Sequence, residues 1–312
     1  MIATVISGTN NIFEVCTNEN KILRVSLKGK ILKTAERFYN ALAPGDEVFL
    51  DENQKQITNI CERKNYFARW NIKKNCPQIL ASNIDALAIV ASVKTPPFHA
   101  RFIDRALVSA TAQNISPLIL INKIDLQDVN DTDFFSRIEN WKALGYKICL
   151  LSAKEKKGFV DFVKIISEKR IAFAGQSGVG KSSIINVLAG FSLQTTGEVS
   201  KKYERGTHTT TQGILLSLSL DEKIFAQKTS VEIIDTPGIR QMILHGISSR
   251  ALQNYFPEFK NCSCSFGMKC THTHEAGCAI LEAVQNHRAT PDRYESYLRM
   301  KSEIEASEKS YE

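Results

Sequence analysis

The stretch GQSGVGKSS, residues 175–183, decides the fold. It matches the pattern GxxxxGK[ST], with a strand-like run RIAFA directly before it and a helix-like run SIINVLAG at its end. A strand, a glycine-rich turn and a helix start in this order predict a phosphate-binding loop, because backbone N–H groups of the turn and the helix N-terminus then face the anion. A chance glycine-rich turn is not expected to have both flanking elements. The loop residues are Gly175, Gln176, Ser177, Gly178, Val179, Gly180, Lys181, Ser182 and Ser183.

The last residues of this loop have distinct expected roles. The ammonium group of Lys181 reaches the β- and γ-phosphates in such loops, and the hydroxyl of Ser182 ligates Mg²⁺. The loop therefore predicts a nucleoside triphosphate with its magnesium ion as the ligand.

A second motif indicates which base is bound. Asn122-Lys123-Ile124-Asp125 follows the strand-like run PLILI. The carboxylate of Asp125 can accept two hydrogen bonds from guanine, whereas adenine would leave it buried and unpaired, a difference of up to about 10⁴-fold. We expect the stem of Lys123 to lie over the base and Asn122 to tie this segment to the phosphate loop.

Two further segments fit the same site. Ser152-Ala153-Lys154 follows the run KICLL, and the backbone N–H of Ala153 is expected to meet guanine O6. Asp235-Thr236-Pro237-Gly238 ends the run VEIID; Asp235 is expected near Mg²⁺, and the N–H of Gly238 is expected to sense the γ-phosphate.

Between these segments, residues 204–211 (ERGTHTTT) form a candidate first switch. A threonine there can ligate Mg²⁺; Thr210 is our choice, with Thr209 and Thr211 as alternatives. The position after DTPG, where many GTPases place a glutamine that orients the attacking water, is Ile239. Another group must then position the water; His208 is the candidate nearest in sequence, and an arginine or an RNA group of a partner is the alternative.

The chain around these motifs reads as three parts. Five short β-rich runs separated by turns fill residues 1–67 and predict a small barrel of the OB-fold type. Residues 68–240 alternate strand-like and helix-like runs, which predicts a parallel sheet covered by helices. Residues 241–312 read as helices around a Cys/His cluster, and Thr290-Pro291-Asp292 looks like a helix start.

The Cys/His cluster predicts a metal site. Cys264, Cys270, His272 and Cys278 offer three thiolates and one imidazole, a closed tetrahedral set that suits structural zinc. Cys262 and His274 are alternative ligands, and iron is an alternative metal.

Composition narrows the function classes. The 312 residues have a formal net charge of +7, and residues 1–75 hold 12 Lys/Arg against 8 Asp/Glu, so the N-terminal part is a candidate nucleic-acid surface. A purely structural barrel with an ordinary solvated surface is the alternative. We find no run of about 18 apolar residues and no secretory signal, so we expect a cytoplasmic protein without membrane contact.

The motif order is unusual. NKID and SAK precede the phosphate loop, the THTTT segment and DTPG, so the GTPase motifs are circularly permuted (G4-G5-G1-G2-G3). With the run KGKILK (residues 28–33) in the barrel and Glu275 inside the Cys/His cluster, nearly the whole chain resembles the ribosome small-subunit-dependent GTPase A family.

The resemblance implies an OB-fold that binds RNA, a P-loop GTPase domain and a helical zinc domain. It also implies a GTP hydrolase that acts late in maturation of the 30S subunit, contacts 16S rRNA and is stimulated by that subunit; we expect it to act as a monomer. Two positions depart from the family pattern: Thr207 stands where an arginine is usual, and five residues instead of four separate Cys264 from Cys270.

The same residues are also compatible with two other functions. The protein can be a GTP-dependent RNA clamp in which hydrolysis serves only release, a reading that Ile239 supports. It can also be an ATPase or kinase that uses the same phosphate loop, against which Asp125 argues.

Overall fold

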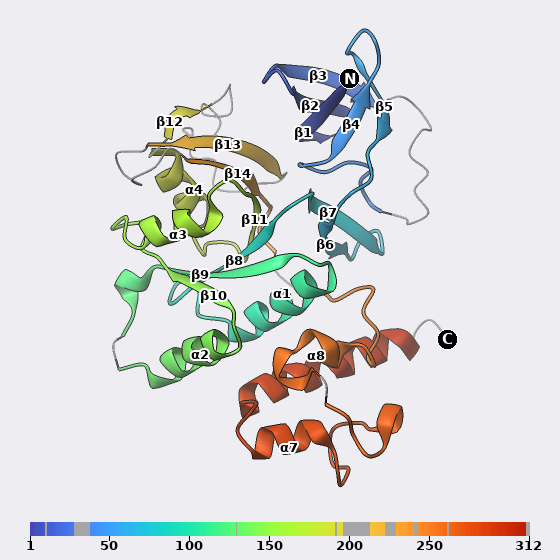
Figure 1. The fold of residues 1–312 in the computed structure, drawn as a ribbon, viewed down its shortest axis with the longest axis vertical. Coiled ribbons are helices and arrows are strands. Elements are labelled where there is room, and N and C mark those ends of the chain that lie inside the picture. Colours follow the sequence, from blue (N-terminus) through green and yellow to red (C-terminus); the bar gives the residue numbers. More distant parts are fainter. Residues whose placement is uncertain are drawn as a thin grey trace.

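The computed structural model describes residues 1–9, 11–27, 38–128, 130–190, 192–195, 213–221, 229–239, 242–260 and 262–309. The run KGKILK and the candidate switch residues 204–211, with His208 and Thr210, lie outside these ranges. Three parts follow one another along the long axis of the molecule: a β-barrel, a layered α/β part and a helical C-terminal part (Figure 1).

The N-terminal barrel has the five strands that the sequence predicts. They are β1 (Ile2–Thr9), β2 (Ile12–Thr17), β3 (Ile22–Leu27), β4 (Glu47–Leu50) and β5 (Gln56–Ile60), and they close in the order β1-β2-β3-β5-β4. Only β3 and β5 pair in parallel. Apolar side chains alternate along the strands, so Val15, Val48 and Ile57 fill the interior. This order is that of the OB-fold, which confirms the prediction.

A seven-stranded sheet forms the middle part. Its order is β10-β9-β8-β11-β14-β13-β12, in which the first five strands are parallel and the last two are antiparallel additions. The strands are β8 (Ala86–Ser92), β9 (Ser116–Asn122), β10 (Lys147–Leu150), β11 (Arg170–Gly175), β12 (Ser192–Thr195), β13 (Ile214–Leu220) and β14 (Thr229–Asp235). The helices packed on it are α1 (Ala100–Ala112), α2 (Thr132–Ala143), α3 (Phe159–Ile166) and α4 (Lys181–Gly190).

The sheet places all the sequence motifs at one edge. NKID follows β9, SAK follows β10, the phosphate loop follows β11 and DTPG follows β14, so each lies at the carboxyl end of a parallel strand. Ligands bind at this edge in open α/β sheets.

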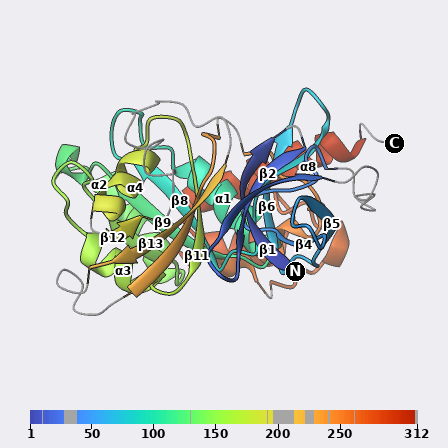
Figure 2. The same cartoon turned by 90° about the horizontal axis from the view of Figure 1, so that it is seen from above.

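Two strands that the sequence does not predict form a separate hairpin. β6 (Tyr66–Asn71) and β7 (Cys76–Ser82) pair with each other and belong to neither the barrel nor the large sheet. The expected boundary between residues 67 and 68 falls inside β6. In Figure 2 the barrel lies beside β13, and Ile6 of β1 is buried in the core of the α/β part. Barrel, hairpin and sheet therefore pack directly on one another.

The C-terminal part consists of short helices around the Cys/His cluster. They are η2 (Leu252–Tyr255), η3 (Pro257–Phe259), η4 (Gly267–Lys269), α7 (Ala279–Gln285) and α8 (Pro291–Lys309). Helix α8 begins at Pro291, as Thr290-Pro291-Asp292 predicts, and Tyr297 is buried in the local core. Val108 of α1 belongs to this same core, so the α/β part contributes to the packing of the C-terminal part.

A buried ion network joins α1 to α8. The Arg293 guanidinium donates to Asp104 Oδ1 at 2.5 Å and to Glu258 Oε1 at 2.7 Å, and all three side chains are completely buried. Trp141 and Ser296 also donate to the carboxylate of Asp104, at 3.0 and 2.6 Å. The guanidinium additionally lies 4.6 Å from the ring centroid of Phe256. Every partner is therefore needed to satisfy the others.

We expect Arg293→Ala to lower the free energy of unfolding by about 3–5 kcal/mol, because it removes the hydrogen-bonded cation of two buried carboxylates and leaves Asp104 with the more distant Arg137, at 3.9 Å. Urea unfolding followed by tryptophan fluorescence measures the loss. Arg299→Ala is the matched control, since Arg299 makes an exposed pair with Glu295 and should cost less than about 1 kcal/mol. Equal losses for the two variants would contradict the structural role of the network.

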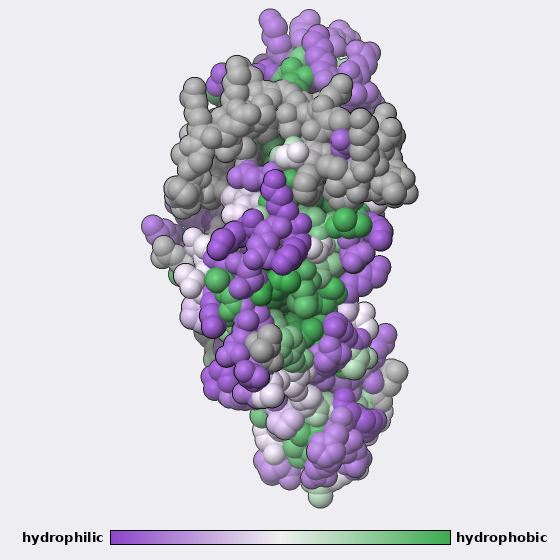
Figure 3. Space-filling view, turned by 90° about the vertical axis from the view of Figure 1, so that its left-hand side faces the viewer, coloured by the Kyte–Doolittle hydropathy of each residue, from purple (hydrophilic) through white to green (hydrophobic). Residues whose placement is uncertain are grey.

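None of the helices that the structure describes has the length and apolar composition to cross a bilayer. Hydrophobic residues do reach the surface; on the face shown in Figure 3 they gather in the middle, with hydrophilic residues around them.

Candidate nucleotide site and metal centre

The phosphate loop has the backbone that an anion cradle needs. Gly178 and Gly180 have φ values of +81° and +97°, a region that glycine enters without steric cost. A Cβ atom on Gly180 would lie 2.2 Å from the side-chain nitrogen of Asn122, and one on Gly175 would lie 2.4 Å from the carbonyl oxygen of Val90. The glycines are therefore required by conformation and by space.

Asn122 ties the loops of the site together, as the sequence predicts. Its Nδ2 donates to the carbonyl of Val179 at 3.0 Å, and its Oδ1 accepts the N–H of Ala153 at 3.1 Å. The side chain thus bridges the phosphate loop and the SAK segment. The N–H of Ala153, which we expect at guanine O6, is directed to Asn122 in this structure.

We expect Gly180→Ala to weaken GDP binding by about 5- to 150-fold, because the new Cβ strains the backbone and displaces Asn122, at a cost of order 1–3 kcal/mol. Isothermal titration with GDP measures the affinity. Gly190→Ala, where a Cβ meets no atom within 4 Å, is the control. An unchanged affinity in Gly180→Ala would show that the Asn122 bridge is dispensable.

The candidate guanine-reading carboxylate is held by a serine. Ser152 is fully buried, and its hydroxyl donates to Asp125 Oδ1 at 2.7 Å while accepting the N–H of Glu155 at 3.1 Å. The SAK motif predicts Ser152 as part of the nucleotide site but does not predict this orienting bond. Lys123 donates to the carbonyls of Gly178, at 2.8 Å, and Thr95, so its stem crosses from the NKID segment to the phosphate loop. Lys154 is exposed.

Lys181 is folded onto the loop that carries it. Its Nζ donates to the carbonyls of Gly175 and Gln176 at 2.9 and 3.1 Å, and the side chain is buried. Burial lowers the pKa of Lys181, while the carboxylate of Asp235 acts in the opposite direction. Ser182 and Ser183, at the start of α4, are exposed. The ammonium group is thus already at the base of the cradle where a phosphate would replace the carbonyls.

The start of the second switch is anchored to β11 and to the phosphate loop. The hydroxyl of Thr236 donates to the carbonyl of Phe173 at 2.6 Å, and the N–H of Ile239 donates to that of Gly175 at 3.0 Å. A Cβ on Gly238 would lie 3.3 Å from the N atom of Ser177, so Gly238 lies against the loop. Ile239 is only 1% exposed and packs in the core. Its side chain is therefore directed into the protein interior.

The four predicted metal ligands converge. The ligand atoms of Cys264, Cys270, His272 and Cys278 all lie within 4.8 Å of one another. Cys264 Sγ is 3.5 Å from His272 Nδ1 and 3.8 Å from Cys278 Sγ. Three thiols and an imidazole at these separations fit a tetrahedral ion, and the cluster can hold a metal. Burial raises the pKa of Cys270 to about 12, a cost that a bound cation removes by stabilising the thiolate.

The alternative ligands, Cys262 and His274, contact other groups beside the cluster. Cys262 directs its sulfur toward the carbonyl of Ala279, at 3.8 Å, and His274 contacts the hydroxyl of Thr273. The carboxylate of Glu275 accepts the N–H groups of Thr271 and Thr273 at 2.6 and 3.1 Å. Hydrogen bonds from Thr271 first, and from the backbone N–H of His274, hold the pKa of Glu275 below its ordinary value. Glu275 thus fixes the loop that presents His272.

Comparison with known proteins identifies the family. The family model described as RsgA GTPase matches residues 60–245, which is more than half of the chain. The chain belongs to the RsgA GTPase family. The match spans every nucleotide motif described above, so the permuted motif order is a family feature.

Named relatives cover almost the full length. A Borrelia recurrentis protein, "Small ribosomal subunit biogenesis GTPase RsgA", is 39% identical over 307 residues, 96% of this chain and 93% of its own. A Bacteroides thetaiotaomicron protein, "Small ribosomal subunit biogenesis GTPase RsgA 2", is 35% identical over 308 residues, 96% of each chain.

Two solved structures share the fold. The structure of YjeQ from Thermotoga maritima has a TM-score of 0.73 at 27% identity, covering 97% of this chain and 98% of its own. That of YloQ, titled a circularly permuted GTPase, has a TM-score of 0.68 at 25% identity and covers 98% and 95%. The barrel, the permuted sheet and the C-terminal helices therefore form one shared architecture.

Proposed function

We propose that the protein is a GTP hydrolase that acts in biogenesis of the small ribosomal subunit. The observation that carries this proposal is the junction at Asn122, where the phosphate loop and the SAK segment meet beside Asp125 at one edge of the sheet. The relatives named as small-subunit biogenesis GTPases support the biological assignment.

Each motif residue has a proposed role. Asp125, held by Ser152, reads the guanine edge, and Lys123 and Ala153 flank the base. The loop residues 175–183 surround the phosphates, with Lys181 on the β- and γ-phosphates.

Ser182 ligates Mg²⁺, Asp235 acts beside it, and the N–H of Gly238 meets the γ-phosphate. Mg²⁺ would neutralise charge on the phosphates. We assign a further magnesium contact to Thr210.

Ile239 gives the hydrolysis step a specific requirement. Its side chain is buried and apolar, so it does not orient the attacking water. We propose that His208, or a group of the bound ribosomal subunit, positions this water. Docking then raises the rate because it completes the site.

The partner is the 30S subunit with its 16S rRNA, and we propose action late in its maturation. Residues 63–84, which include the hairpin β6–β7, contain five Lys/Arg and no Asp/Glu. Lys73, Lys74 and Ile72 are exposed at its turn, with Ile72 69% exposed, and such a cationic surface suits phosphates. We propose that the protein works as a cytoplasmic monomer and that the metal of the Cys/His cluster is zinc, a structural ion.

The test is steady-state GTP hydrolysis by the protein alone, with small subunits and with large subunits. We expect stimulation by the small subunit only, and GTP but not ATP should compete for the site. Equal rates in all three samples would overturn the small-subunit assignment while leaving the guanine-nucleotide site intact.

The burial of Ile239 also favours a second candidate function, a GTP-dependent RNA clamp in which hydrolysis serves only release. A variant that binds GTP and the subunit but does not hydrolyse distinguishes the two. Normal subunit maturation in cells that carry only this variant would favour the clamp.

A further inference from the structure

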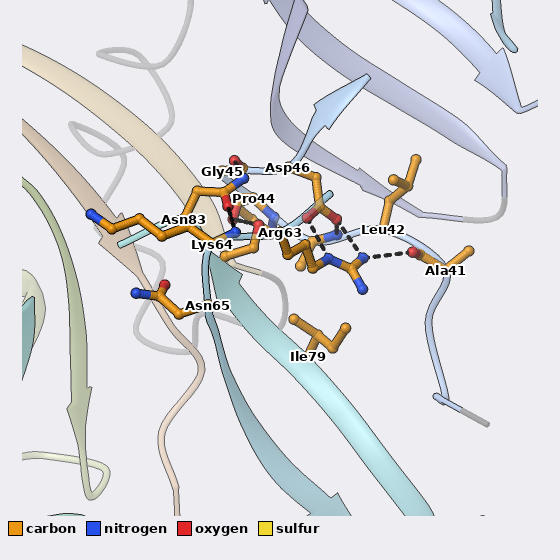
Figure 4. Close-up of polar contacts among 12 residues, drawn as sticks. Ala41, Leu42, Pro44, Gly45, Asp46, Arg63, Lys64, Asn65, Ile79 and Asn83 are labelled. Carbon is orange, nitrogen blue, oxygen red and sulfur yellow. Dashed lines mark hydrogen bonds and ion pairs between the residues drawn. The ribbon is translucent and has the colours of Figure 1, made fainter. Parts of the chain in front are cut away.

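One turn of the barrel is bonded to the barrel strands, to the hairpin β6–β7 and to the large sheet. We call residues 41–46, which precede β4, the barrel joint (Figure 4). The joint belongs to the barrel: the N–H of Gly45 donates to the carbonyl of Val5 at 2.9 Å, and the N–H of Val5 donates to that of Asp46 at 2.8 Å.

A buried ion pair fixes the shape of the joint. Arg63 Nε donates to Asp46 Oδ1 at 2.7 Å, its terminal nitrogen donates to Asp46 Oδ2 at 2.8 Å, and the same nitrogen reaches the carbonyl of Ala41 at 2.9 Å. Asp46 is completely buried and also accepts the N–H of Ala43 at 2.9 Å. Bidentate pairs of this kind are directional, so they hold the joint in one shape.

The joint is also bonded to the hairpin and to the sheet. The N–H of Ser82 donates to the carbonyl of Pro44 at 3.0 Å, and Asn83 and Arg170 donate to that of Gly45 at 3.0 and 3.2 Å. A Cβ on Gly45 would lie 2.2 Å from the carbonyl oxygen of Ser82 and 3.1 Å from Ile234. Ile234 directly precedes Asp235, so the joint contacts the strand that carries the second switch.

Pro44 of the joint lies close to Gly213, the residue that directly precedes β13. Gly213 lies between the candidate first switch and β13, and its neighbour Ile214 pairs with Asp235. A Cβ on Gly213 would be 3.3 Å from the ring of Pro44, 3.2 Å from the carbonyl of Leu80 and 3.4 Å from that of Asp235. Pro44 therefore lies close to Gly213, where a side chain one carbon larger would already press on its ring.

We infer that the barrel joint couples the barrel to the two switches, so that a partner gripping the barrel changes GTP turnover through the contact of Pro44 with Gly213. This inference rests on the proposed function for the identity of the partner. Coupling of binding equilibria is reciprocal, so a partner that changes the nucleotide affinity through this joint has its own affinity for the barrel changed by the nucleotide by the same factor.

The test uses the full-length protein with Pro44→Ala, which removes the ring contact, and Gly213→Ala, which crowds it. GTP hydrolysis is measured alone and with saturating small subunits, and GDP affinity is measured alongside. We expect both variants to lose about fivefold or more of the stimulation, the lower range of typical allosteric couplings, while basal hydrolysis and GDP affinity stay within about twofold. The ratio of subunit affinities with a GTP analogue and with GDP should shrink in parallel.

Matched controls are Pro257→Ala, on the C-terminal part, and Gly190→Ala, where a Cβ meets no atom within 4 Å. Both should keep wild-type stimulation. The inference is overturned if Pro44→Ala and Gly213→Ala also keep it, or if they lose basal hydrolysis in the same proportion as stimulated hydrolysis. Absence of stimulation in the wild-type protein would instead overturn the proposed function.

Discussion

Replacing Lys181 by alanine is expected to lower the rate of GTP hydrolysis by about 10²–10³-fold, the usual loss when one pre-positioned donor to the transition state is removed. The Lys181 ammonium is buried at the base of the phosphate loop, where, within the described part of the chain, two carbonyls and the nearby carboxylate of Asp235 compensate its charge. A triphosphate is a far stronger partner than these carbonyls, and it gains negative charge on its transferring oxygens during the reaction.

Single-turnover hydrolysis with saturating GTP measures this loss apart from any change in affinity. Lys164→Ala is the control, because Lys164 is an exposed residue of α3 whose recorded partner is Asp161. A residual rate within about tenfold of wild type would mean that the transition state does not depend on this ammonium.

The second large effect is expected in the metal centre. Cys278→Ser should abolish stoichiometric zinc binding and unfold the C-terminal part, because the apparent binding energy of a structural zinc ion, about 10–16 kcal/mol, becomes folding energy. Cys278 is almost completely buried and precedes α7 directly, so its loss removes both a ligand and the anchor of that helix. Metal analysis gives zinc per chain, and limited proteolysis reports the unfolding.

Cys262→Ser is the matched control for this experiment. Cys262 lies two residues before Cys264, yet its sulfur contacts the carbonyl of Ala279 and lies outside the four-ligand group. We expect this variant to retain one zinc ion per chain and the proteolysis pattern of the wild type. Loss of zinc from Cys262→Ser, with retention in Cys264→Ser, would reassign the first ligand.

Much of the fold follows from local sequence. The five barrel strands and the strand–loop–helix around Gly175 could be predicted because apolar periodicity and turn residues act over a few neighbours. The hairpin β6–β7 could not, since its tip, Asn71–Asn75, is flanked by runs without clear alternation. Its burial arises from packing against the barrel joint and the sheet.

The candidate site could also be predicted only in part. The motifs predict which residues gather at the sheet edge, and the bridge from Asn122 to the phosphate loop is confirmed. The orienting bond from Ser152 to Asp125 and the network around Arg293 were not predicted. The latter joins residues 189 positions apart in the chain, and no local pattern encodes such a contact. Spacing alone also could not separate Cys264 from Cys262.

Helix α1 contributes residues both to the core of the α/β part and to the core of the C-terminal part. Its native packing therefore depends on parts of the chain that are synthesised at different times. Its Asp104 and Val108 are covered by α8, which contains the last residues that the structure describes. Chains emerge from the ribosome N-terminus first, at about 5–20 residues per second, so the α/β part is synthesised seconds before helix α8, which packs on it. Before α8 is synthesised, Asp104 has Trp141 and Arg137 of α2 beside it but lacks Arg293 and Ser296, so the native packing of α1 is completed after the α/β part has been made.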